Sequence, residues 1–234
     1  MKKHIPNLLT LCNLLSGCIG VVFAVRGNFE AVLICLMVSE LCDFSDGFAA
    51  RALHAYSDIG KELDSLADLI SFGLCPAVCL FSWYSIAQPD VPFLRWVPFL
   101  LAAASALRLA KFNIDTRQST SFLGLATSGC ALLLTPLAVY SFYSDGFLHT
   151  LMSTVWFIPV LSVLFSFLLV CEWPMFSLKK MTGQLRAFIV GSVVLVVVCV
   201  IREIHGPWYK TVSLCIFAIL TFYLVLNLAL LRRK

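Results

Sequence analysis

Residues 41–51 of the chain read LCDFSDGFAAR, and residues 60–68 read GKELDSLAD. Each stretch places two acids on one face of a helix, because side chains three or four residues apart lie above one another. The four acids are Asp43, Asp46, Asp64 and Asp68. We expect two consecutive helices to fold back on each other and to bring the two pairs together at a similar depth.

The chain around these acids is strongly apolar. Of its 234 residues, 60% are hydrophobic and only 13% are charged, which is roughly half the charged share of a soluble domain. Several charge-free runs exceed the ~18 residues that indicate a membrane-spanning helix. These runs are residues 4–25, 69–89, 118–144, 146–171 and 211–231. The sequence therefore predicts an all-α integral membrane protein, and its composition excludes a disordered chain.

Hydrophobic runs and turn residues predict about eight transmembrane helices. Their expected ranges are 5–25, 29–53, 59–82, 92–110, 121–142, 149–171, 186–203 and 210–231. Thirteen of the 17 Lys and Arg residues fall on one side of this arrangement. Because basic residues concentrate on the cytosolic side, we expect both termini and the acidic pairs to face the cytosol of a multi-pass cell membrane protein. The basic residues thus follow membrane topology, and no nucleic-acid partner is expected.

Four carboxylates near a membrane interior cannot all stay ionised unaided, because burial and like charge both disfavour ionisation. Two divalent cations would cancel their charge, oxygen ligands favour Mg²⁺ or Mn²⁺, and paired metals suit displacement at phosphorus. Gly47 leaves space beside Asp46, and Arg51 can reach a phosphate at the cytosolic rim. Two other interpretations remain open: a proton or cation relay in a transporter, or structural pairing of the acids with Arg51 and Lys61.

The acids and their neighbours follow one pattern, Asp43-x2-Asp46-Gly47-x2-Ala50-Arg51-x8-Gly60-x3-Asp64-x3-Asp68. This pattern resembles, position for position, the signature of the CDP-alcohol phosphatidyltransferases. The resemblance implies an integral membrane enzyme that transfers a phosphatidyl group from CDP-diacylglycerol to an alcohol and releases CMP. It also implies two divalent cations, Mg²⁺ or Mn²⁺, and a homodimer.

The resemblance further implies roles for the individual acids. Asp43, Asp46 and Asp64 would hold one metal. Asp43, Asp64 and Asp68 would hold the second, and Asp68 would also be the catalytic general base that takes the proton of the attacking hydroxyl.

Four residues are expected at the nucleotide and diphosphate of CDP-diacylglycerol by the same resemblance: Asn7, Gly47, Arg51 and Ser57. Two of them also have a simpler interpretation. A serine in a connection often caps a helix, and an asparagine after a proline often marks a turn or a helix start. Ser57 and Asn7 could therefore have structural roles alone.

Residues 6–17, 64–77 and 108–113 are similar to the phosphatidylserine synthase branch of the family. The similarity implies L-serine as the acceptor, with Arg108 and Lys111 at its carboxylate, although both could instead be basic anchors at the membrane surface. The branch usually has Arg where Lys111 stands. The alternatives are another acceptor, such as glycerol 3-phosphate or an inositol derivative, and a cation-coupled transporter.

The domain organisation predicted from these features has two parts. Residues 1–171 are expected to form a six-helix phosphatidyltransferase core, and residues 172–234 a C-terminal membrane extension of two helices.

Overall fold

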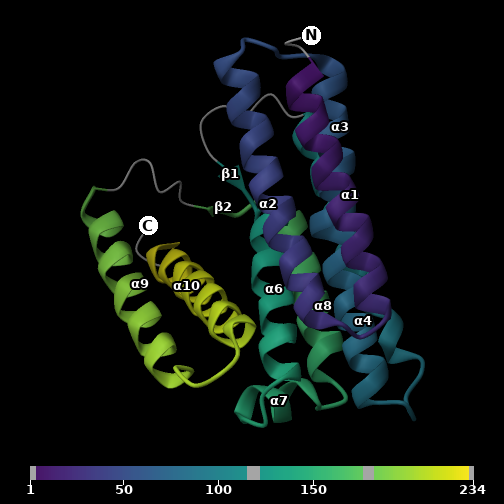
Figure 1. Cartoon of the computed structure of the whole chain (residues 1–234), viewed down its shortest axis with the longest axis vertical. Coiled ribbons are helices and arrows are strands. Elements are labelled where there is room, and N and C mark those ends of the chain that lie inside the picture. The colour runs from purple at the N-terminus through teal and green to yellow at the C-terminus, as the bar shows by residue number, and fades with distance from the viewer. Residues whose placement is uncertain (1–3, 115–121, 176–181, 232–234) are drawn as a thin grey trace.

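The computed structural model describes residues 4–114, 122–175 and 182–231, which form a helical bundle (Figure 1). The first half contains α1 (Ile5–Val25), α2 (Phe29–Ala52), α3 (Asp58–Asp68), the π-helical turn η2 (Leu69–Leu74), α4 (Cys75–Ala87), the 3₁₀ turn η3 (Leu94–Trp96) and α5 (Phe99–Ile114). The second half contains β1 (Phe122–Leu123), α6 (Thr127–Phe142), α7 (Phe147–Met152), α8 (Phe157–Val170), β2 (Pro174–Met175), α9 (Thr182–Arg202) and α10 (Trp208–Leu231).

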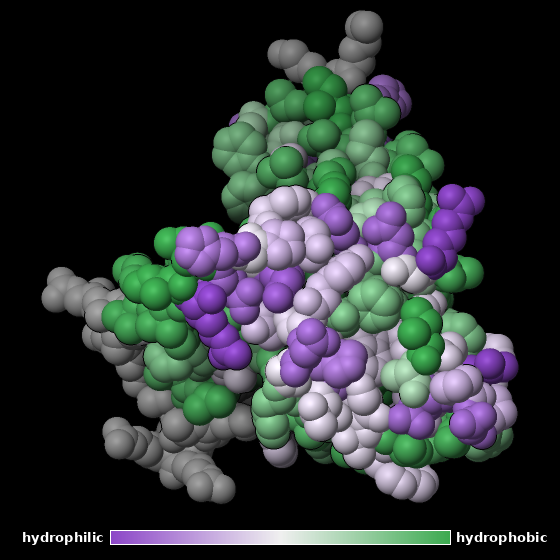
Figure 2. All heavy atoms as spheres, turned by 60° about the horizontal axis from the view of Figure 1, so that its bottom comes forward, coloured by the Kyte–Doolittle hydropathy of each residue, from purple (hydrophilic) through white to green (hydrophobic). Residues whose placement is uncertain are grey.

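The prediction of an all-α membrane protein is confirmed. Four described stretches are long and apolar enough to cross a membrane: Ile5–Val25, Asp58–Ala87, Leu94–Ile114 and Trp208–Leu226. Further apolar helices are shorter, and α2 has 24 residues but carries acids along its length. Polar side chains gather over the end of the molecule that carries α7, with apolar surface beside them (Figure 2). This distribution suits a bundle whose sides face lipid and whose end faces water.

Two predicted helices differ from the structure at one end. The helix expected at 59–82 continues to Ala87, because no Gly or Pro follows Pro76 until Pro89. The helix expected at 121–142 begins only at Thr127. The chain before it turns at a glycine, Gly124, with a φ of +72°, which residues with a side chain rarely adopt.

Two other predicted helices are interrupted or shifted. The stretch expected as one helix at 149–171 forms two, α7 and α8, with a turn between them. The helix expected at 92–110 lies at Phe99–Ile114, preceded by η3 and by a turn that contains Pro98. The remaining four predicted helices agree with the structure to within four residues at each end.

The apolar core lies where α2, α4, α6 and α8 meet. Its large buried side chains include Phe29, Leu80, Trp83, Leu134 and Ile158. The helix α1 packs along α2, while α10 packs against α6 and α9 packs against α10. Side chains of α10 contact the same core cluster. Near the end of α9, Cys199 is buried in a cluster with Tyr140 of α6, and Tyr140 donates a hydrogen bond to Glu203, so both ends of the hairpin turn hold it to the bundle. The proposed boundary at residue 171 stays a prediction.

The π-helical turn η2 is the place where α1, α5 and α6 converge. Two glycines allow this convergence. A Cβ placed on Gly17 of α1 would lie 2.3 Å from Ser71 Oγ and 2.8 Å from Ser71 Cα. A Cβ on Gly73 would lie 2.9 Å from Ser105 Cβ of α5. Since real side chains do not tolerate such approaches, η2 can lie this close to its neighbours only with glycine at both positions.

We therefore expect Gly17→Ala to destabilise the protein by about 1–3 kcal/mol, the usual cost of overpacking. The measurement is the free energy of unfolding in detergent micelles. Gly146→Ala is the matched control, because a Cβ at Gly146 meets nothing within 4 Å. Equal stability of the two variants would contradict the close crossing of α1 and η2.

Candidate active site

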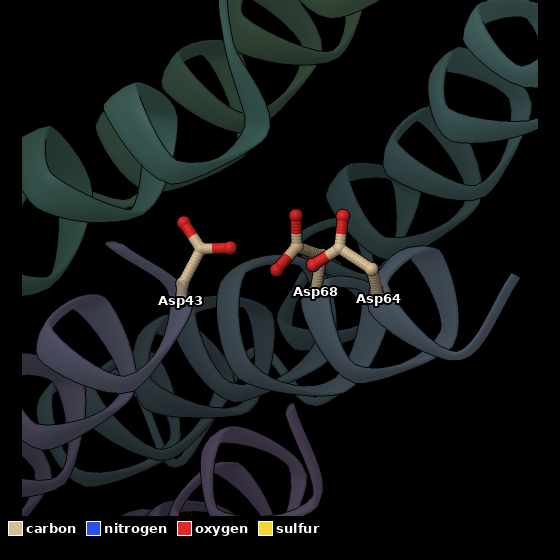
Figure 3. Close-up of side chains that lie close together, drawn as sticks. All are labelled: Asp43, Asp64 and Asp68. Atoms are coloured by element: carbon tan, nitrogen blue, oxygen red, sulfur yellow. The ribbon is translucent and has the colours of Figure 1, made fainter. Parts of the chain in front are cut away.

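Three of the four predicted acids lie together. One carboxylate oxygen from each of Asp43, Asp64 and Asp68 is within 4.8 Å of the others, and all three side chains are half-buried. Asp43 extends from α2 toward Asp64 and Asp68, which lie one turn apart on α3 (Figure 3). We call these three residues the acidic cluster. Like charges this close repel one another in a half-buried setting, so a bound cation would stabilise the cluster.

The donor set of the acidic cluster suits a hard divalent cation. All of its ligand atoms are carboxylate oxygens, which Mg²⁺ and Mn²⁺ prefer over nitrogen or sulfur ligands. The Oδ1 atom of Asp64 is buried and has no hydrogen-bond partner among the described residues. An unpartnered buried carboxylate oxygen is expected to find a ligand, and a metal ion would provide one.

Asp46 lies one turn further along α2 and has a different environment. It is 6% exposed, and Thr10 of α1 donates a hydrogen bond of 2.5 Å to its Oδ2. Asp46 is not part of the acidic cluster as defined above. Its predicted role as a ligand of a first metal therefore stays a prediction, with Thr10 holding the orientation of its carboxylate.

A polar pocket of about 200 Å³ opens beside the acidic cluster. The start of α1, the end of α2 and the start of α3 enclose it, and its lining includes Asn7, Asp46, Gly47, Ser57 and Asp64. Three of the four residues predicted to contact the nucleotide thus line one pocket. Asp64 belongs to both the pocket and the acidic cluster, so a ligand in the pocket lies next to the carboxylates.

The pocket residues also have structural surroundings that explain their positions. Ser57 caps α3, because its Oγ accepts a hydrogen bond of 3.0 Å from the Gly60 backbone N–H. Ser57 is therefore a helix cap, as a serine in a connection often is, and the same residue also lines the pocket, so its nucleotide role stays a prediction. A Cβ on Gly47 would meet Arg51 Nη1 at 3.5 Å, so the exposed Arg51 side chain lies over the glycine. Arg51 is therefore placed at the edge of the pocket.

The two residues predicted to bind the acceptor are placed differently. Arg108 of α5 is half-buried, and its Nη1 donates a hydrogen bond of 3.1 Å to Thr127 Oγ1 of α6. It lies close enough to Asp68 for an electrostatic interaction. Lys111 is exposed near the end of α5. The structure therefore associates Arg108 with the acidic cluster and leaves Lys111 at the surface.

Two residues of α1 that contact the acids were not predicted from the sequence. Thr10 bonds Asp46, and Asn13 donates a hydrogen bond of 3.2 Å from Nδ2 to Asp68 Oδ1. Both are buried on α1. Their spacing offered a signal, because Thr10, Asn13 and Ser16 recur every three residues in an otherwise apolar helix. Polar residues on one face of a membrane helix usually face other helices rather than lipid.

The fold and the site together define a helical membrane protein with a carboxylate cluster beside a polar, ligand-sized pocket. Such a combination suits a metal-assisted reaction beside a bound ligand. The chain belongs to the CDP-alcohol phosphatidyltransferase family, whose model matches residues 3–168. The resemblance stated from the acidic pattern is therefore confirmed.

Curated relatives share this similarity. The chain is 35% identical over 124 residues to the CDP-diacylglycerol–serine O-phosphatidyltransferase of Bacillus subtilis, covering 53% of this chain and 68% of the relative. It is 31% identical over 147 residues to the archaetidylserine synthase of Methanothermobacter thermautotrophicus, covering 60% of each. It is 31% identical over 186 residues to the Mycobacterium bovis CDP-diacylglycerol–serine O-phosphatidyltransferase, covering 76% of this chain and 61% of the relative.

The family is divalent-metal dependent, and the acidic cluster could bind such a metal. We expect Asp64→Asn to raise the thermal stability of the metal-free protein, because it removes one of three repelling charges. The same variant should raise the Kd for Mn²⁺ at least about tenfold, because a ligand is lost. Thermal unfolding in detergent, with and without Mn²⁺, measures both effects.

Asp145→Asn is the control for this pair of effects, because Asp145 is an exposed carboxylate between α6 and α7. It should leave both the metal-free stability and the response to Mn²⁺ unchanged. An Asp64→Asn protein that Mn²⁺ stabilises as strongly as the unmodified chain would contradict metal binding at the acidic cluster.

Proposed function

We propose that this protein transfers the phosphatidyl group of CDP-diacylglycerol to the hydroxyl of L-serine, giving phosphatidylserine and CMP. The observation that carries the proposal is the acidic cluster beside the polar pocket, with Asp64 in both. A nucleotide in the pocket would place its diphosphate near the carboxylates. The names of the relatives in Bacillus subtilis and Mycobacterium bovis support serine as the acceptor.

The polar pocket is the proposed site for the nucleotide end of CDP-diacylglycerol. Asn7 and Ser57 offer side-chain hydrogen-bond groups to the nucleotide. Gly47 has no side chain and so leaves space for the nucleotide at its part of the pocket wall. Arg51 extends over Gly47, where its guanidinium can bind a diphosphate oxygen through charge-assisted hydrogen bonds. The acyl chains would stay on the apolar side of the helices, since that surface faces lipid.

The metal ligands are proposed as two overlapping sets. Asp43, Asp64 and Asp68 would hold one divalent cation, and Asp43, Asp64 and Asp46 would hold another. Such cations, Mg²⁺ or Mn²⁺, supply neutralisation of the phosphoryl oxygens and of the CMP leaving group. The proximity of the three oxygens in the acidic cluster supports the first set. The family resemblance supports the second, with Thr10 bonded to Asp46 Oδ2.

Asp68 is the proposed general base. Its Oδ1 accepts the hydrogen bond from Asn13, so its other oxygen can accept the proton of the attacking hydroxyl. The hydroxyl oxygen then forms the new bond to phosphorus, and the bond from phosphorus to the CMP oxygen breaks. A positioned carboxylate contributes by holding the proton acceptor and the nucleophile in one geometry.

The acceptor is proposed to lie between Asp68 and Arg108. Arg108 is the basic group that the structure associates with Asp68, and one guanidinium suits the single negative charge of a serine carboxylate. Glycerol 3-phosphate carries a dianionic group and calls for more than one such cation. Lys111 would contribute at the entrance to the site, because it is exposed.

The orientation and assembly are also part of the proposal. The excess of Lys and Arg at one set of helix ends supports a cytosolic position for both termini and for the pocket. The family resemblance supports a homodimer. We propose residues 1–171 as the catalytic core and residues 172–234 as a membrane extension, consistent with a family match that ends at residue 168.

Purified protein should release CMP only when CDP-diacylglycerol, a divalent metal and L-serine are all present. Asp68→Asn should lower this rate about 10²–10⁴-fold, because the proton acceptor is lost, and should change CDP-diacylglycerol binding less than about tenfold. CMP release with glycerol 3-phosphate and none with serine would overturn the choice of acceptor. Ion-coupled flux in proteoliposomes without any CMP release would favour a transporter instead.

The nucleotide pocket is tested by Gly47→Ala. We expect the KM for CDP-diacylglycerol to rise about tenfold, because a methyl group enters the pocket wall, while thermal stability stays unchanged. The added Cβ meets only the end of the flexible Arg51 side chain, at 3.5 Å. Gly129→Ala on α6 is the matched control, since its Cβ also makes only ordinary contacts, at 3.7 Å. A KM that is equal in both variants would contradict the pocket assignment.

A further inference from the structure

Asn13 is a fully buried polar residue in the middle of α1, with 0% of its surface exposed. Its backbone carbonyl accepts hydrogen bonds from Ser39 Oγ of α2, at 3.3 Å, and from Ser71 Oγ of η2, at 2.9 Å. Its side-chain Nδ2 donates to Asp68 Oδ1 at 3.2 Å. Three helices therefore fix this residue in place, and its amide is directed at the proposed base.

The other end of the same amide has no partner. Asn13 Oδ1 is buried and accepts no hydrogen bond within the described residues. Buried amide carbonyls are nearly always paired in folded proteins, because an unpaired one loses its hydration without replacement. A residue held so firmly, with an open acceptor next to the reacting group, is suited to receive a hydrogen bond from a ligand.

Arg108 has an open group of the opposite kind. Its Nη1 is bonded to Thr127, but its Nε is buried and donates to no partner within the described part of the chain. Both Arg108 and Asn13 act on Asp68, one electrostatically and the other by a hydrogen bond. The surroundings of Asp68 thus contain one unused hydrogen-bond acceptor and one unused cationic donor.

We propose that Asn13 Oδ1 binds the ammonium group of the acceptor, while Arg108 binds its carboxylate. This inference rests on the proposed transfer to serine and adds a determinant of specificity to it. In serine, the carbon next to the hydroxymethyl group carries both the ammonium and the carboxylate. A hydroxyl placed at Asp68 therefore puts both groups within reach of the residues around that acid. The negative acidic cluster also favours a cationic donor at Asn13 over a neutral one.

The proposal predicts how the site selects its acceptor. A site built to pair a donor rejects an analogue that lacks it, because the protein's own polar group is left unpaired. The enzyme should therefore prefer L-serine strongly over 3-hydroxypropanoate, which is serine without the amino group. Ethanolamine lacks the carboxylate instead, so its rejection should depend on Arg108 and be independent of Asn13.

The test compares kcat/KM for these three acceptors in Asn13→Ala, Asn13→Asp and the unmodified chain. Asn13→Ala should reduce the preference for serine over 3-hydroxypropanoate about 100-fold and leave the preference over ethanolamine unchanged. Asn13→Asp keeps an oxygen acceptor at the same place and should keep the serine preference, although its kcat falls because the hydrogen bond to Asp68 is lost. Equilibrium dialysis of labelled L-serine with Mn²⁺ and CMP should show the same loss of affinity in Asn13→Ala.

Ser16→Ala is the structural control. Ser16 is also buried on α1, and its hydroxyl donates a hydrogen bond of 2.8 Å to the Cys35 carbonyl of α2. This variant loses a comparable helix contact away from Asp68, so its acceptor preference should stay unchanged. Asn13 also donates to Asp68, a proposed metal ligand, so Asn13→Ala is expected to weaken Mn²⁺ binding, and all variants are compared at saturating Mn²⁺.

Three results would overturn the inference while leaving the proposed function intact. In the first, Asn13→Ala lowers kcat/KM for serine and 3-hydroxypropanoate equally. In the second, Asn13→Ala binds labelled L-serine as tightly as the unmodified chain at saturating Mn²⁺, so the amide carbonyl does not contact the acceptor. In the third, Asn13→Ala keeps the serine preference and Glu40→Gln loses it. Glu40 of α2 is the alternative partner for the ammonium, because its Oε1 is also buried and unpartnered within the described residues. Absence of CMP release with serine in the unmodified chain would instead overturn the proposed function.

Discussion

The site depends on one close crossing, that of α1 over the π-helical turn η2. Gly17 has no side chain to separate the two helices, so Ser71 of η2 reaches the backbone carbonyl of Asn13 at 2.9 Å. Asp68 immediately precedes η2, and the same crossing brings it within hydrogen-bond distance of Asn13. A π-helical turn at this place is in keeping with the frequent occurrence of such turns at functional sites. The position of the proposed base is thus set by helix packing.

Repulsion between the carboxylates of the acidic cluster destabilises the helix packing that brings them together. Bringing Asp43, Asp64 and Asp68 within 4.8 Å of one another costs electrostatic free energy unless a cation or protons compensate. The crossing of α1, α2 and η2 supplies the necessary constraint, since buried serine hydroxyls and glycine contacts hold these helices independently of the acids. A cluster held together against this repulsion would bind a divalent ion more strongly than one that is free to relax.

The sequence predicted the fold class and the family because both are carried by local patterns. Long apolar runs indicate membrane helices wherever they pack, and the acidic pattern has fixed spacing within two adjacent helices. What the sequence did not predict depends on contacts between distant segments. The hydrogen bond between Asn13 and Asp68 joins residues 55 positions apart, and the break between α7 and α8 lies in a stretch without charges. Polar spacing on α1 indicated a buried face but not its partner.

The two ends of the site differ in burial, and this difference suits two substrates of unequal size. The pocket proposed for the nucleotide is bounded by exposed side chains such as Tyr56 and Ser57, which could adjust to a large, lipid-linked ligand that arrives from the membrane surface. Outside the lining of this pocket, Asn13 is fully buried and Arg108 is half-buried, so their unpaired atoms have little freedom to move. Because a rigid polar site discriminates between small ligands more strongly than a flexible one, the proposed acceptor side would contribute most of the specificity.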